Sequence, residues 1–155
     1  MGILLLPIAI LAAWLLAAFD VTAPGVHDAG TFSEAGIQWM LIIPGGVTFL
    51  VSGVMHTAFA RTTAKNIGWK TNGFQYEIGF VSFGLGAAGI IACLSAPPAW
   101  LPVAVAQSIF LVLAGLNHVR GMVKDQNFAP GNSTILLYDF GLPISYLILF
   151  MLNWS

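Results

Sequence analysis

Four ionisable side chains of this 155-residue chain lie in or beside apolar segments, where a charge is costly. They are His56, Glu77, His118 and Asp139. Imidazole titrates near neutrality, and both imidazole and carboxylate bind divalent metals. Two imidazoles with two carboxylates are therefore a ligand set for iron, manganese or zinc, and also the parts of a proton relay.

The four residues belong to a pattern that occurs twice. G-x-x-H-x19-Y-[ED]-x-G spans residues 53–79 and again residues 115–141, an offset of 62 residues without a gap. The chain has only three histidines and six carboxylates, and the pattern uses two of each, so chance is a weak explanation. The pattern predicts a helical hairpin that is used twice in the same orientation, with a common ancestry as the hypothesis.

The composition indicates an integral membrane protein whose main partner is the lipid bilayer. The chain is 58% hydrophobic and 7% charged, with a mean hydropathy of +0.89. Its net charge of −1 provides no basic surface for nucleic acid. The single cysteine, Cys93, cannot form an intrachain disulfide.

Five apolar segments are each close to the ~20 residues that a helix needs to cross hydrocarbon. We interpret residues 1–155 as a single all-α transmembrane domain, with spans at about 2–19, 37–59, 74–96, 101–122 and 134–154. The first resembles a signal peptide but lacks a positive n-region, so we keep it as a span. "PGG" at 44–46 predicts a kink whose freed carbonyls need partners. The small residues of the third span predict a closely packed helix, at the centre of the bundle or at an oligomer contact.

Charge sets the expected orientation. The five basic residues fall in two places, at the connection between the second and third spans (Arg61, Lys65 and Lys70) and at the connection between the fourth and fifth (Arg120 and Lys124), and the other two connections carry no Lys or Arg. The positive-inside rule then places the N-terminus in the cytoplasm and the C-terminus outside. In the outer connection, His27 and three carboxylates can bind a cation weakly, although a solvated acidic loop is the simpler interpretation.

Depth brings the four ionisable groups into one layer. At 1.5 Å rise per residue, the two histidines lie about 7–9 Å below the inner helix ends, and the two carboxylates about 7–10 Å. Spans two to five would form a pseudo-twofold four-helix bundle around this layer, with each histidine paired to the carboxylate of its own hairpin. Gln75, Tyr76, Asn117 and Tyr138 are then expected to contact these four side chains or to line a pocket beside them.

Three functions fit such a layer. The first is a divalent metal site (Fe, Mn or Zn) with a redox role; haem held by two histidines is less attractive beside two acids. The second is a proton-linked pocket for a small molecule or a quinone headgroup. The third is a structural lock in an accessory or assembly subunit of a membrane complex, without chemistry of its own. A homo-oligomer or a larger complex is compatible with each.

The stretch "NHVRGMVKDQNFAPGNSTILLYDFGLP", with "GFQYEIGF", resembles an uncharacterised family of small bacterial polytopic membrane proteins and, more loosely, the four-span DoxX-like proteins. The resemblance covers about half of the chain. It implies a bacterial origin and a helical membrane fold, and it implies no activity. With the topology above, we expect the protein in the bacterial cytoplasmic (inner) membrane.

Overall fold

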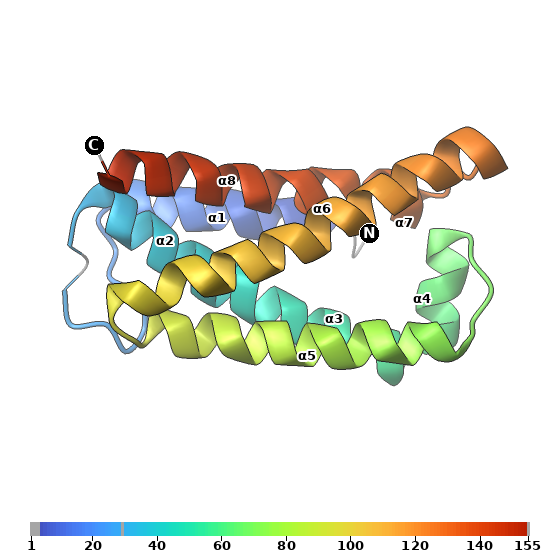
Figure 1. Ribbon diagram of the computed structural model, residues 1–155, viewed down its shortest axis with the longest axis horizontal. Helices are drawn as coiled ribbons and strands as arrows, with labels where there is room; N and C mark the ends of the chain where they lie inside the picture. The colour runs from blue at the N-terminus through green and yellow to red at the C-terminus, as the bar shows by residue number, and fades with distance from the viewer. Residues whose placement is uncertain (1–3, 29, 155) are drawn as a thin grey trace.

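The computed structural model describes residues 4–28 and 30–154, and this part of the chain is helical with no strand. Its long helices run along one axis, and the connections gather at the two ends of the bundle (Figure 1). The elements are α1 (Leu5–Ala18), α2 (Phe32–Ile42), η2 (Ile43–Thr48), α3 (Phe49–Thr57), α4 (Ala60–Ile67), α5 (Gly73–Cys93), η3 (Pro97–Ala99), α6 (Trp100–Asp125), α7 (Pro130–Ser133) and α8 (Leu136–Trp154).

Four helical segments of the described chain are long and apolar enough to cross a membrane. They are Phe32–Thr57, Gly73–Cys93, Pro97–Asp125 and Pro130–Trp154. Many large apolar side chains on α1, α5, α6 and α8 are exposed, as lipid-facing side chains would be. The length and composition of these helices, together with their exposed apolar side chains, therefore support the prediction of a membrane protein.

The first predicted span is the exception. α1 has 14 residues, a length of about 21 Å, which is less than the ~30 Å of bilayer hydrocarbon. It packs against α2 and α8, and the Trp14 indole N–H donates to Ser145 Oγ at 3.0 Å. The structure thus supports four spans by length and a shorter apolar helix attached to them; the first of the five predicted spans, 2–19, is not confirmed as a span.

The predicted break at "PGG" is present. Residues Ile43–Thr48 form a π-helical segment, η2, between α2 and α3. Its carbonyls find side-chain donors, because Tyr138 Oη donates to Pro44 O at 2.6 Å and Gln107 Nε2 donates to Gly45 O at 2.6 Å. Since a π segment changes the register of the helix that follows, η2 sets the direction in which α3 presents His56.

The centre of the bundle differs from the prediction. The α2–α3 span has a larger buried share than α5, so it is the central helix. The small residues of α5 still allow a close approach to it: a Cβ at Gly89 would lie 2.5 Å from Gly45 O, and one at Gly86 2.9 Å from Gly46 O. α5 is therefore a closely packed neighbour of η2 with an exposed outer face.

Candidate functional site

His118, on α6, is held by Asn132 of the short helix α7. His118 Nδ1 lies 2.8 Å from Asn132 Oδ1, while Asn132 Nδ2 donates to His118 O at 3.2 Å and to Asn127 O at 2.8 Å. Those two carbonyls fix the amide orientation, so Oδ1 must accept and Nδ1 must carry the proton. The other ring nitrogen, Nε2, is left to face Asp139.

Asp139, on α8, completes a buried pair. His118 Nε2 lies 4.0 Å from Asp139 Oδ2, and Asp139 is 2% exposed. Oδ2 has no hydrogen-bond partner among the described residues. A separation of 4.0 Å is too long for a direct hydrogen bond, but a small movement or one water would connect the atoms. The pair can hold one proton on either the imidazole or the carboxyl group.

Trp69 covers the other side of His118. The two rings stack with centroids 5.1 Å apart and planes inclined by 12°. α4 ends in a Schellman motif, in which Gly68 N–H donates to Lys65 O and Trp69 N–H donates to Ala64 O. Gly68 adopts φ +81°, which disfavours other residues, and the turn directs the indole onto the imidazole.

His56, at the end of α3, pairs with Gln75 rather than with the expected Glu77. Gln75 Nε2 donates to His56 Nδ1 at 2.7 Å. Glu77 is exposed, because it follows Gln75 by two residues and points about 200° away around α5. The expected His56–Glu77 pair is therefore absent, and an amide takes the place of the carboxylate.

The two copies of the repeat have different surroundings. Tyr76 is 44% exposed, whereas its counterpart Tyr138 is 4% exposed and bound to η2. Glu77 is exposed, whereas Asp139 is buried. The repeated pattern thus does not produce two equivalent sites, and the four ionisable groups do not converge: the structure joins His118 to Asp139 and leaves Glu77 outside.

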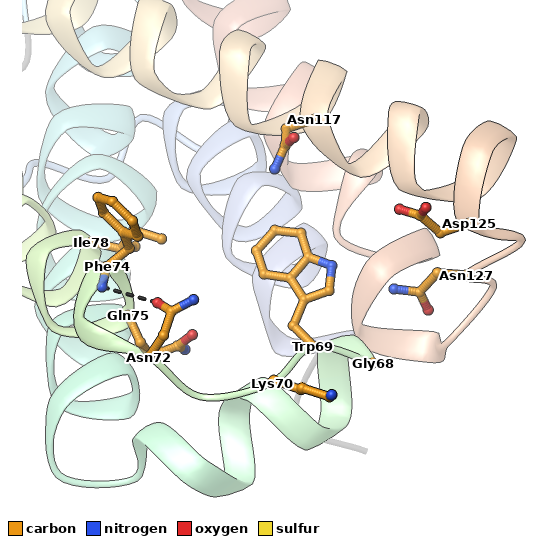
Figure 2. A pocket seen from close by; sticks show the side chains of 10 residues that line it. All are labelled: Gly68, Trp69, Lys70, Asn72, Phe74, Gln75, Ile78, Asn117, Asp125 and Asn127. Carbon is orange, nitrogen blue, oxygen red and sulfur yellow. Dashed lines mark hydrogen bonds between the residues drawn. The ribbon is translucent and has the colours of Figure 1, made fainter.

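A cavity of about 730 Å³ opens beside both histidines at the end of the bundle where α4, α5 and α6 meet. Figure 2 shows the Trp69 indole between Gln75 on one side and Asp125 and Asn127 on the other, with Asn117 facing it. Trp69 stacks on His118 and Gln75 is bonded to His56, so each histidine is one side chain away from the cavity. The remaining wall residues are Gly68, Lys70, Asn72, Phe74 and Ile78.

The four residues expected beside the histidines and carboxylates lie in different surroundings. Gln75 contacts His56, and Asn117 lines the cavity. Tyr138 instead donates a hydrogen bond to a carbonyl of η2, and Tyr76 is exposed. Sequence reasoning missed Trp69 and Asn132. A signal for Asn132 is its position directly after Pro130 and Gly131, in the connection between α6 and α8.

The expectation of a metal site stays a prediction. Within residues 4–28 and 30–154, no group of three or more His, Cys, Asp or Glu side chains is placed to hold a metal ion. His118 and Asp139 provide two such groups, and Asn132 already occupies one imidazole nitrogen. The arrangement provides a buried His118–Asp139 pair that can hold one proton, next to a cavity lined by aromatic and amide side chains.

Comparison with known proteins places the chain in a family without assigning an activity. No curated protein and no solved structure matches it, and the looser likeness to DoxX-like proteins has no support. The family model that does match covers nearly the whole sequence. Over residues 3–155, the chain belongs to DUF6790, a family of unknown function.

Proposed function

We propose that this protein binds a small planar molecule with hydrogen-bonding oxygens, such as a quinone headgroup, and couples that binding to proton exchange at His118 and Asp139. The observation that carries the proposal is the cavity of about 730 Å³, whose wall contains Trp69 and Gln75, the direct partners of the two histidines. A ligand there would touch both partners without displacing either histidine.

The chemistry of the wall defines the ligand class. An indole and the Phe74 ring favour a flat apolar face, and amides such as Asn117 and Gln75 can donate to carbonyl or hydroxyl oxygens. One cation, Lys70, and one anion, Asp125, leave no net charge on the wall, which favours an uncharged ligand. A quinone headgroup combines a flat ring with two carbonyl oxygens and reaches such a site from the bilayer.

The proton would come from the buried pair. With Asn132 fixing the tautomer, His118 presents Nε2 to Asp139 Oδ2, and one proton can be held by either group. Because Trp69 lies between His118 and the cavity, a ligand that stacks on or moves the indole changes the surroundings of the imidazole. Binding and protonation are thereby linked.

The membrane arrangement is part of the same proposal. We place the protein in the bacterial cytoplasmic membrane with five spans, α1 being the shortest, the N-terminus inside and the C-terminus outside. The support is that all five basic residues lie at one end of the bundle, on α4, in the α4–α5 connection and in the last turns of α6, and the positive-inside rule makes that end cytoplasmic (Figure 1). The cavity then opens toward the cytoplasmic leaflet.

Calorimetry with ubiquinone-1 tests the binding step on purified protein in detergent. We expect saturable binding that weakens about tenfold or more in Trp69→Leu, because an aromatic contact is lost. Trp154→Leu removes an exposed indole from the far end of the bundle and should leave the affinity unchanged. Absence of saturable binding, or equal loss in both variants, would overturn the proposal.

A metal site remains a second candidate, favoured by one observation. Asp139 Oδ2 is buried without a partner beside His118 Nε2, as two ligands awaiting an ion would be. Elemental analysis of pure protein decides this case: stoichiometric iron, manganese or zinc that is lost in His118→Ala supports a metal centre, and metal-free wild type removes it. A protein that binds neither quinone nor metal would fit the accessory-subunit alternative.

A further inference from the structure

A second cavity, of about 440 Å³, lies at the opposite end of the bundle from the first. It is formed where the connection before α2 meets the start of α2, the end of α5 and the start of α6. The groups on its wall that can accept a hydrogen bond or carry charge are His27, Asp28, Glu34, Gln38, Cys93 and Ser95. None of them takes part in the proposed quinone site.

Gln38 provides the strongest sign of a ligand. Gln38 lines the cavity and is 5% exposed, and its Oε1 has no hydrogen-bond partner among the described residues. Burial of a carbonyl oxygen without a donor is costly, so native structures normally satisfy such atoms. A donor held in the cavity beside Gln38 would supply the missing partner.

The charge of the wall defines that donor. Asp28 and Glu34 are its ionisable acids, and no lysine or arginine lines it. Each carboxylate uses one oxygen locally: Asp28 Oδ1 accepts from Gly30 N–H at 3.0 Å, and Glu34 Oε2 accepts from Thr31 N–H at 2.8 Å. The second oxygen of each faces no cation in the described chain, which favours a positively charged occupant.

The wall is fixed before any ligand arrives. Thr31 and Glu34 form a capping box at the start of α2. The Trp39 indole N–H donates to Val21 O at 2.6 Å, which ties the connection to α2. At Gly25, with φ +80°, an added Cβ would lie 2.6 Å from the Leu94 side chain, so the chain passes close to the end of α5. A preformed wall lowers the ordering cost of binding.

We propose that this outer cavity binds a small organic cation with N–H donors, namely a primary ammonium or guanidinium group. The cation donates to Gln38 Oε1 and is balanced by Asp28 and Glu34. A bare metal ion fits less well, because within the described residues no three His, Cys, Asp or Glu side chains are grouped to hold one. The site is independent of the proposed quinone function and would lie on the outer side of the membrane.

Calorimetry on the full-length protein in detergent tests this site with butylammonium, with tetraethylammonium as a cation that lacks N–H groups. Butylammonium should bind, and tetraethylammonium should bind at least about tenfold more weakly, because hydrogen bonds to charged donors are the strong ones. Gln38→Leu should weaken butylammonium to a similar degree. Thermal unfolding of each variant shows whether it is folded.

Charge variants complete the test. Asp28→Asn and Glu34→Gln keep the local hydrogen-bond acceptors but should each weaken butylammonium, whereas Asp20→Asn, in the same connection but off the cavity wall, should not. Equal affinity for the two cations, unchanged affinity in folded Gln38→Leu, or an equal loss in Asp20→Asn would overturn the proposal. Binding of Ca²⁺ in preference to butylammonium would overturn it as well.

Discussion

Replacing Gln107 by Leu should destabilise the bundle, because this side chain closes the break in the central helix. Gln107 is 0% exposed; its Nε2 donates to Gly45 O at 2.6 Å and to Leu85 O at 3.0 Å, and its Oε1 accepts from Tyr146 Oη at 2.7 Å. Hydrogen bonds between membrane helices contribute roughly 0.6–1.7 kcal/mol each. Loss of all three predicts a decrease of about 2–5 kcal/mol in the free energy of unfolding.

A double-mutant cycle isolates one of these bonds. Tyr146→Phe removes the hydroxyl that donates to Gln107 and, more weakly, to Met40 O at 3.3 Å, so it should cost about 1–2 kcal/mol. The double variant should lose less than the sum of the single variants, with a coupling energy of about 0.6–1.7 kcal/mol.

Unfolding in mixed dodecylmaltoside and SDS micelles, followed by circular dichroism, measures these free energies. Ala106→Leu, an exposed position on the same helix, is the control and should change stability little. A Gln107→Leu protein as stable as wild type, or strictly additive effects in the cycle, would refute the assignment of Gln107 as the group that satisfies η2.

Two further predictions concern the histidine site. Asn132→Leu removes three hydrogen bonds at a fully buried position. We expect it to lower the free energy of unfolding, measured in the same micelles, by about 2–4 kcal/mol. An unchanged free energy of unfolding would contradict the role of Asn132 in holding His118. Gly68→Ala places a Cβ at φ +81° and should cost more than about 1 kcal/mol while shifting the emission of Trp69, whereas Gly84→Ala, which meets nothing within 4 Å, should not shift it.

The fold was predictable where a local rule applies. Composition predicts the membrane class, and "PGG" predicts the break in the second span, since proline and glycine disturb a helix whatever surrounds them. The first predicted span, 2–19, was less secure, because α1 is apolar but too short to cross hydrocarbon at full thickness. Length at the ends of a helix depends on local capping, which hydropathy alone does not determine.

The sequence allows a prediction of how deep the site residues lie along their helices, but not of which way their side chains point. The repeat identified His118 and Asp139, which do meet, and His56, whose partner is the neighbouring Gln75. One or two positions along a helix decide which face a side chain takes, and the π segment η2 resets that register before His56. The role of Trp69 depends on the left-handed turn at Gly68 and on packing against α6, which no periodicity reveals.

The proton released or taken up when ubiquinone-1 binds tests the central claim most directly. Calorimetric titrations in buffers of different ionisation enthalpy measure that number. The account predicts a non-zero value for the wild type and a value near zero in Asp139→Asn, with Glu77→Gln, an exposed carboxylate variant, behaving like the wild type. Binding without proton exchange in the wild type, or the same exchange in Asp139→Asn, would contradict it.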